Sequence, residues 1–269
     1  LTDYAKQEAA KDEDTFITYF TAGSDPADQV SDIEDLLIKD VDVMVILPIE
    51  SASITPIANK VYSQGIDTII LDRAISNQQF TSYIGGDNEG IGRAAAHYIA
   101  NKLNGKGKVV EILGVPSEIT KLRSKGFHEE IKKFPNIEIV ATGNGNFQRG
   151  KSLNVMTDIL QANEKIDAVY SHDDEQSIGI AAAIRQAGRE DEMFVTGAGG
   201  NKSVFKRIMD GSELLTATFT YSPTMGGSAV ALAKKMAKSE GMTELWEKAI
   251  PKKIVLRAAT VTEENAKVY

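Results

Sequence analysis

Short apolar runs alternate with amphipathic helical patterns along most of this chain of 269 residues. The apolar runs, which are typical of buried strands, cover 15–20, 41–47, 66–71, 83–85, 108–113, 137–141, 168–171 and 193–196. Helical patterns occupy 25–39, 53–64, 90–103, 120–133, 150–162, 176–187 and 203–210. Strands that alternate with helices form parallel sheets with helices on both faces. The sequence therefore predicts an α/β fold with doubly wound parallel sheets.

The alternation is interrupted at Asn104-Gly105-Lys106-Gly107, a turn-forming stretch after which a new series of strands and helices begins. Three later segments add structure that continues neither half in simple order: 216–221, a helix at 224–238, and the closing segment 254–256. We therefore predict two lobes and a chain that passes between them more than once. The first lobe is expected to comprise 1–103 and 224–252, and the second 104–223 and 253–269.

Composition narrows the classes of function. The formal net charge is −8, and Lys and Arg are scattered among acidic residues instead of forming the basic stripe of a nucleic-acid-binding surface. No nucleic-acid partner is predicted. The chain has no cysteine, which excludes disulfides, thiolate metal sites and thiol catalysis.

The first residues, Leu1-Thr2-Asp3-Tyr4-Ala5-Lys6, lack the apolar core of a signal peptide, and no stretch has the roughly 20 apolar residues of a membrane span. A mature, a truncated and a cytosolic chain are all compatible with this start. The first eleven residues read as the end of a helix, and a strand usually precedes such a helix in a wound sheet. We expect the first strand of the fold to be missing from this sequence.

Polar residues follow the ends of several predicted strands, where small ligands bind in parallel α/β sheets. Asp72-Arg73 follows the run 66–71, and a carboxylate beside a guanidinium suits neighbouring hydroxyl groups of a polyol or sugar. An ordinary surface ion pair is the alternative. Asp87-Asn88 is expected to cap the helix that begins near Gly90, with an edge left for a ligand.

Catalytic and cofactor motifs are incomplete. Asp173-Asp174-Glu175 begins a helix, whose dipole accounts for three acids better than an acid–base centre does. The three histidines, His97, His128 and His172, show no metal-ligand spacing and are expected to have surface or partly buried roles. The glycine-rich loop 197–203 does not have the spacing of a phosphate-binding loop. Gly90-Ile91-Gly92-Arg93 lacks the third glycine of a dinucleotide-binding fingerprint, so we interpret it as a site of close helix packing. The Gly-x-Ser-x-Gly motif of serine hydrolases does not occur. Binding is therefore favoured over catalysis, and no cofactor or metal is predicted.

A set of motifs along almost the whole chain resembles the ribose- and galactofuranose-binding branch of the periplasmic sugar-binding proteins. The motifs are Asp25-Pro26-Ala27-Asp28-Gln29-Val30-Ser31-Asp32-Ile33-Glu34-Asp35-Leu36, Ile70-Leu71-Asp72-Arg73, Ile84-Gly85-Gly86-Asp87-Asn88, Arg123-Ser124-Lys125-Gly126-Phe127, Gly150-Lys151-Ser152-Leu153-Asn154-Val155-Met156 and Asp173-Asp174-Glu175. The resemblance implies a type I periplasmic binding protein, with two lobes joined by a three-crossing hinge that closes on one sugar. Such proteins are the solute receptors of ABC importers and are not enzymes.

The resemblance also implies a ligand site. Asp72 and Arg73 would bind sugar hydroxyls from the first lobe and Arg123 from the second, Phe147 would pack on the sugar ring, and Asp173 occupies a position that is usually asparagine. For Phe147, a core side chain that anchors the loop is the alternative. Asn88, within a matching motif, completes the set.

Two positions depart from the ribose receptors. Gly199 stands where they carry aspartate, and Tyr221 where they carry glutamine. Loss of a carboxylate at Gly199 frees volume and removes a hydroxyl acceptor. A larger, substituted or partly deoxygenated sugar could therefore replace ribose.

The partners implied are a sugar and the permease subunits of an ABC importer, for a monomeric, exported receptor whose signal peptide lies outside this sequence. A periplasmic sugar-sensing domain of a transmembrane signalling protein is the main alternative. The effector-binding core of a repressor and a sugar-modifying enzyme that uses Asp173 or Asp174 are less favoured, because no helix-turn-helix precedes the core and no partner motif accompanies the carboxylates.

Overall fold

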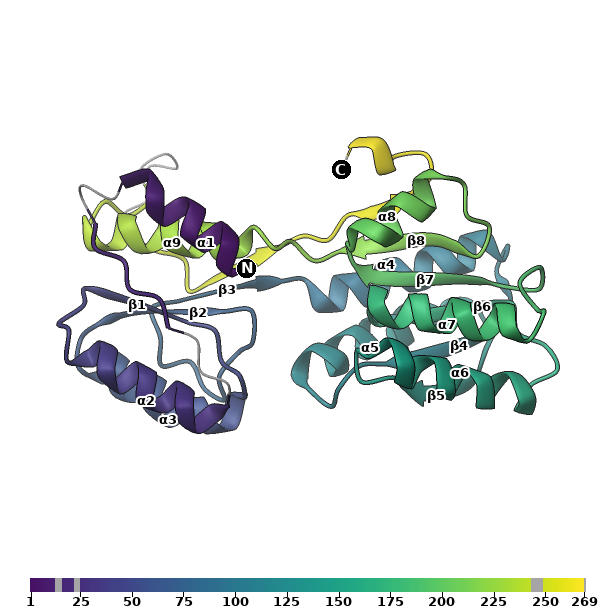
Figure 1. Cartoon of the computed structure of the whole chain (residues 1–269), viewed down its shortest axis with the longest axis horizontal. Helices are drawn as coiled ribbons and strands as arrows, with labels where there is room; N and C mark the ends of the chain where they lie inside the picture. The colour runs from purple at the N-terminus through teal and green to yellow at the C-terminus, as the bar shows by residue number, and fades with distance from the viewer. Residues whose placement is uncertain (13–15, 22–24, 243–248, 269) are drawn as a thin grey trace. The chain divides into compact units, whose positions relative to one another are not determined.

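The computed structural model describes residues 1–12, 16–21, 25–242 and 249–268. The chain divides into two compact units (Figure 1). Unit 1 comprises Leu1–Gly86 and Pro223–Leu256, and unit 2 comprises Asp87–Ser222 and Arg257–Tyr269. The chain therefore passes between the units three times, as the predicted hinge requires.

Within the described residues, unit 1 contains a parallel four-stranded sheet in the order β1-β2-β3-β9. These strands are β1 (Val43–Ile46), β2 (Asp67–Leu71), β3 (Ser82–Gly86) and β9 (Lys253–Leu256). The helical segments are α1 (Thr2–Ala9), η1 (Ala10–Asp12), α2 (Pro26–Leu37), α3 (Ser51–Ser63) and α9 (Met225–Ala237). In Figure 1, α1 and α9 cover one face of the sheet, and α2 and α3 cover the other.

Unit 2 contains, in the part of the chain described, a six-stranded sheet in the order β10-β8-β7-β6-β4-β5. Its strands are β4 (Lys106–Leu113), β5 (Asn136–Asn144), β6 (Ala168–Ser171), β7 (Phe194–Gly199), β8 (Leu215–Thr220) and β10 (Thr260–Thr262), of which β10 alone is antiparallel to its neighbour. The helical segments are α4 (Asn88–Lys102), α5 (Glu118–Ile131), α6 (Arg149–Ala162), α7 (Asp174–Gln186), α8 (Lys202–Met209) and η3 (Ala266–Val268). Separate apolar clusters fill the two faces of this sheet, so it is doubly wound as predicted.

Local signals set many element ends. Asp25 caps α2 by accepting hydrogen bonds from the backbone N–H groups of Ala27 and Asp28, at 2.8 and 2.9 Å. Gly65, Gly188 and Gly211 follow helices with φ of 83°, 64° and 76°, a conformation that glycine adopts without steric cost. The predicted caps and stops at these positions are confirmed.

The strand expected at 15–20 is not confirmed. Residues 16–21 carry no regular secondary structure, and Thr15 lies outside the described residues. Segment 16–21 makes no ladder with β1, which pairs only with β2 among the described strands. Phe16, Tyr19 and Val43 help to line a cavity of about 690 Å³ beside this segment.

The lobe boundaries differ from the predicted ones by a single residue at Pro223, which belongs to unit 1, and by several residues in two other places. Residues 87–103 belong to unit 2, because α4 packs tightly on α5: a Cβ at Gly92 would lie only 2.6 Å from the backbone nitrogen of Phe127. This also confirms that Gly90–Arg93 serves close helix packing. Residues 253–256 belong to unit 1, because β9 pairs with β3, with Ile254 opposite Ile84. None of the described helices has the length and apolar content needed to cross a membrane.

Candidate functional site

The carboxyl ends of the parallel strands in unit 2 carry four of the eight predicted ligand residues. Asp173 comes two residues after β6, Gly199 is the last residue of β7, and Tyr221 directly follows β8. Phe147 lies between β5 and α6. Parallel strands bring their carboxyl ends to one edge of a sheet, so positions distant in sequence meet there.

Arg123 is the centre of this group. It lies on α5 with 5% of its surface exposed, and its Nε donates to the side-chain oxygen of Asn88 at 3.0 Å. Its Nη1 donates to the backbone carbonyl of His172. The guanidinium also lies over the ring of Tyr221, 5.3 Å from the ring centroid. Two other predicted residues, Asn88 and Tyr221, therefore both contact the guanidinium of Arg123.

Asn88 is the first residue of α4 and is buried. The cap is the preceding residue, Asp87, which accepts a hydrogen bond from the Gly90 backbone at 2.7 Å. The predicted cap is thus confirmed at Asp87, and the helix begins two residues earlier than expected. Asn88 is left to hold Arg123.

Asp173 caps α7 by accepting from the backbone N–H groups of Glu175 and Gln176, at 2.8 and 3.4 Å. Burial raises the pKa of Asp173, against these hydrogen bonds and the positive charge of Arg123. This half-buried carboxylate therefore lies within electrostatic range of the guanidinium. One oxygen serves the cap, and the other adjoins Gly199, where an added Cβ would lie 3.8 Å from it.

Gly199 has a φ of 126° and the following Gly200 a φ of 85°. Side-chain-bearing residues rarely adopt such values, so this backbone path favours glycine over the aspartate expected from the resemblance to ribose receptors. The carboxylates of Asp173 and Asp174 also stand next to the position. A third acid there would add like-charge repulsion.

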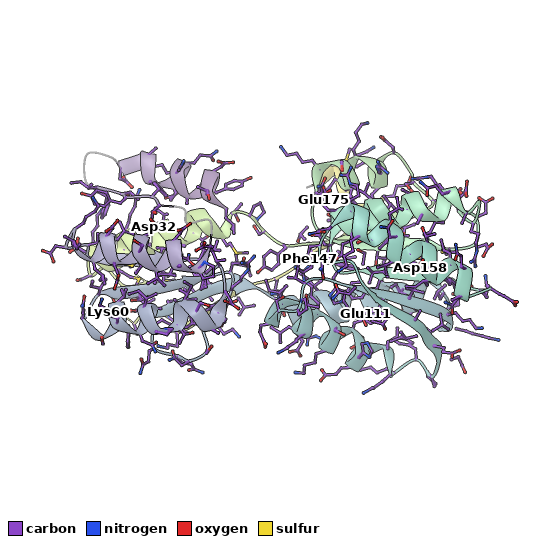
Figure 2. All side chains as sticks on the ribbon, turned by 60° about the horizontal axis from the view of Figure 1, so that its bottom comes forward. Asp32, Lys60, Glu111, Phe147, Asp158 and Glu175 are labelled. Carbon is purple, nitrogen blue, oxygen red and sulfur yellow. The ribbon has the colours of Figure 1, made fainter. Side chains whose placement is uncertain are left out.

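Phe147 adopts a φ of 59°, uncommon for a residue with a large side chain. Its ring rests on the backbone of Gly114, just after β4, where any Cβ would collide with the ring. The side chain remains partly exposed at one end of unit 2, as Figure 2 shows. The contact with Gly114 supports the loop-anchoring alternative, and the exposed remainder leaves ring surface available for stacking.

Asp72 and Arg73 occupy the equivalent edge of the unit 1 sheet, directly after β2. Asp72 has a φ of 66°, and its backbone carbonyl accepts a hydrogen bond from the hydroxyl of Tyr83 at 2.8 Å. Arg73 is exposed, and its Nη1 donates to the backbone carbonyl of Ile49 at 2.7 Å. Unit 1 thus holds an oriented guanidinium at a strand end, as unit 2 does.

Glu111 is the main residue that sequence reasoning missed. Its side chain, 1% exposed, accepts hydrogen bonds from Nε2 of His128 at 2.8 Å and from Nε2 of His172 at 3.0 Å. Burial opposes ionisation, but the two imidazoles outweigh it and lower the pKa of Glu111 to about 2. A charged residue inside the apolar strand Val109-Val110-Glu111-Ile112 was the available signal.

The prediction for the histidines is therefore wrong in one respect. His172 is fully buried, and it shares Glu111 with His128. His97 is exposed and His128 partly exposed, as expected. None of the described residues forms a group of three or more acidic or histidine side chains suited to a metal ion.

Asp174 is buried and does more than complement the helix dipole. It accepts from the backbone of Gly200 and Asn201, at 2.8 and 2.6 Å, and from the hydroxyl of Thr218 at 2.8 Å. Burial raises the pKa of Asp174 to about 6. These bonds join the ends of β6, β7 and β8, which fixes the edge on which Asp173 and Gly199 lie. The role is structural.

Comparisons with known proteins agree with the fold. Residues 2–241 match the family model described as periplasmic binding protein domain. The chain is 33% identical over 207 residues to the ribose import binding protein of Bacillus subtilis (strain 168), covering 77% of this chain and 66% of that protein. It is 30% identical over 226 residues to the galactofuranose-binding protein of Escherichia coli (strain K12), covering 80% and 70% respectively.

Solved structures extend the similarity to nearly the whole chain. The fructose-binding periplasmic domain of a hybrid two-component system is 35% identical with a TM-score of 0.84, and the match covers 99% of this chain and 87% of that domain. A solute-binding protein of an ABC transporter from Bacillus halodurans C-125, with bound myo-inositol, is 25% identical with a TM-score of 0.88, covering 99% and 90%.

These matches confirm the resemblance inferred from the motifs, the two-lobe α/β fold and the expectation of a receptor instead of an enzyme. The chain belongs to the type I periplasmic sugar-binding proteins, a family of solute receptors that serves ABC sugar importers.

Proposed function

We propose that this protein binds a monosaccharide or related polyol at the carboxyl edge of the unit 2 sheet, through Arg123 and the residues around it. The observation that carries the proposal is the buried guanidinium of Arg123, held by Asn88 and the His172 carbonyl and flanked by the ring of Tyr221. A fixed guanidinium beside a carboxylate and an aromatic ring offers donors, an acceptor and an apolar face, the combination that a sugar uses.

Each side chain has a distinct role in this proposal. Arg123 donates to adjacent hydroxyls, the free edge of Asp173 accepts from one, and Phe147 and Tyr221 pack on apolar faces of the ring. Asp72 and Arg73 offer an acceptor and donors to sugar hydroxyls at the equivalent strand end of unit 1. A wrong epimer would leave a buried donor unpaired at a cost of about 1–3 kcal/mol, which gives stereochemical selectivity.

The absence of a side chain at Gly199 bears on the ligand. The site lacks an acceptor where ribose receptors carry a carboxylate, and the backbone conformation favours glycine there. We expect ribose not to be the preferred ligand. The names of the relatives suggest a first panel: ribose, galactofuranose, fructose, arabinose, allose, xylitol and myo-inositol.

Isothermal titration calorimetry against this panel tests the proposal. Arg123→Ala should weaken the tightest ligand at least tenfold. Arg185→Ala, at an exposed arginine in the last turn of α7, is the matched control and should bind as the wild type does. No heat with any sugar, from protein freed of carried-over ligand, would refute the proposed function, and an unchanged affinity in Arg123→Ala would remove Arg123 from the site.

An importer receptor and a sensor domain remain two candidate settings for the same site. The relatives named as import proteins favour a receptor that delivers sugar to an ABC permease. In this setting we propose a monomeric, exported protein. The 35% identity to a periplasmic domain of a two-component system favours the sensor. A transmembrane segment and kinase in the same polypeptide would identify a sensor, whereas sugar-dependent stimulation of a separate permease ATPase would identify a receptor. Small-angle scattering with and without sugar tests the predicted closure.

A further inference from the structure

Glu111 is a buried charge that sugar binding, as proposed above, does not use directly. It lies on β4, on the sheet face that α5 covers, next to Tyr170 of β6 in the strand register. Burying a carboxylate costs several kcal/mol unless it is paired, and an apolar residue would serve the core at lower cost. The two imidazole donors offset this cost. Three polar side chains that could be replaced by apolar ones suggest that Glu111 has a role besides packing.

His172 connects Glu111 to Arg123. Its ring donates from Nε2 to Glu111, its backbone N–H donates to the carbonyl of Ile112 at 3.0 Å, and its own carbonyl accepts from Arg123. An ionised carboxylate can only accept, so the proton of the neutral His172 ring is on Nε2. Nδ1 then has no hydrogen-bond partner among the described residues. The bond to Glu111 is therefore the one hydrogen bond that orients this ring among the described residues.

Charge balance leads to the same connection. The guanidinium of Arg123 is buried, and the acceptors identified for it, the Asn88 side chain and the His172 carbonyl, are neutral. Burial lowers the pKa of His172, Glu111 opposes this, and the charge of Arg123 reinforces it. The histidine thus lies in the fields of both charges. A buried cation is stabilised by a nearby anion. The charge of Arg123 acts directly on Asp173, and Glu111 is linked to the guanidinium through the ring and the carbonyl of His172.

We propose that Glu111 is a positioning residue for the sugar site: through His172 it fixes the carbonyl that holds Arg123 and supplies buried negative charge that balances the guanidinium. Arg123 then presents its donors in one geometry, and the following residue, Asp173, is placed with it. This inference rests on the proposed function, because Arg123 is taken to contact the sugar.

Glu111→Gln tests the inference, because it keeps the side-chain volume and removes the charge. We expect the affinity for the tightest sugar of the panel to fall at least fivefold. In an Arg123→Ala background the same substitution should change the affinity less than twofold, since Glu111 acts through Arg123. Binding within twofold of the wild type in Glu111→Gln, or an equal loss in both backgrounds, would overturn the inference.

Two further variants separate positioning from a general effect on the core. His172→Gln keeps the backbone carbonyl and an amide donor toward Glu111, so it should bind within about threefold of the wild type. His172→Leu cannot donate and should lose as much affinity as Glu111→Gln. Equal affinities for these two variants would refute the role of the Glu111–His172 bond. His128→Gln, which alters the partly exposed partner of Glu111, is the matched control and should bind normally.

A measurement without ligand distinguishes this inference from the proposed function. The side-chain Nε–H signal of Arg123 in a ¹H–¹⁵N spectrum reports its bond to Asn88. Glu111→Gln should shift that signal in the sugar-free protein, and His128→Gln should leave it in place. An unshifted signal overturns the positioning role whether or not a sugar binds. A shifted signal in a protein that binds no sugar supports positioning while the proposed function fails.

Discussion

Gly126→Ala is expected to force α4 and α5 apart and to lower the free energy of unfolding. A Cβ at this position would lie 2.9 Å from the backbone carbonyl carbon of Glu89, with the carbonyl oxygen closer still, whereas ordinary contact begins at 3.4 Å. The two helices would have to separate by at least about 0.5 Å, because a backbone group cannot rotate away as a side chain can.

The expected magnitude follows from two opposing effects. Overpacking a tight interface costs about 1–3 kcal/mol, and alanine regains up to about 1 kcal/mol of helix propensity. Because the obstacle is backbone, we expect the overpacking cost to lie near the upper end of its range. The free energy of unfolding should then fall by about 2 kcal/mol in total. For a unit of this size that corresponds to about 4–8 °C in the melting temperature.

Thermal unfolding followed by circular dichroism measures this loss, and Gly150→Ala provides the control. Gly150 lies in the first turn of α6, and a Cβ there would meet nothing within 4 Å. The control should be unchanged or stabilised by up to about 1 kcal/mol. A Gly126→Ala protein as stable as the wild type would refute the reasoning, as would an equal loss in the control. The separation should also weaken sugar binding, because the 3.0 Å bond between Arg123 and Asn88 joins these two helices.

Three further outcomes are expected. Burial works against the charge of Glu111, but its imidazole partners lower its pKa from 4.5 to about 2, so it stabilises the fold above pH 4.5 and loses this effect as the pH falls toward 2. When the pH is lowered from 5 to 2, the free energy of unfolding measured with urea should therefore fall by about 3 kcal/mol more in the wild type than in Glu111→Gln. An equal pH dependence in the two proteins would contradict this. Asp174→Asn should lower the free energy of unfolding by about 1–3 kcal/mol, because the amide nitrogen of asparagine cannot accept a hydrogen bond from the donors around it. The control is Asp158→Asn, at an exposed residue of α6 (Figure 2), which should change the free energy of unfolding little. Tyr170→Phe should leave stability unchanged or raise it by up to about 1 kcal/mol in thermal unfolding, because the buried hydroxyl has no partner among the described residues; a clear loss would show that this hydroxyl is bonded.

Much of the fold follows from local sequence. The alternation of apolar runs with helical patterns, the cap at Asp25 and the glycines that end helices act over a few residues, so they can be recognised without knowledge of the tertiary structure. The strand-end positions of Asp72, Asp173 and Gly199 were accessible for the same reason, since a parallel sheet gathers the carboxyl ends of its strands. Family motifs then supplied the candidate role of Arg123.

Other features depend on contacts between segments far apart in the chain. Residues 87–103 could not be assigned to unit 2 from their own pattern, because the assignment depends on the fit of Gly92 against α5. The segment 16–21 has the composition of a strand, but a strand forms only where a neighbouring strand pairs with it.

The amino-acid sequence alone determined most of the elements, where several of them end, and which polar residues follow the strands, because those properties arise from neighbouring residues. Only the tertiary structure decided that Glu111, His128 and His172 form hydrogen bonds with one another's side chains through Glu111, and that the His172 carbonyl accepts from Arg123. It also gave Gly199 a backbone conformation that disfavours aspartate. Glu111 and His172 are 61 residues apart, and what joins them is the pairing of β4 with β6. That pairing is a property of the folded sheet, and no local pattern in the sequence encodes it.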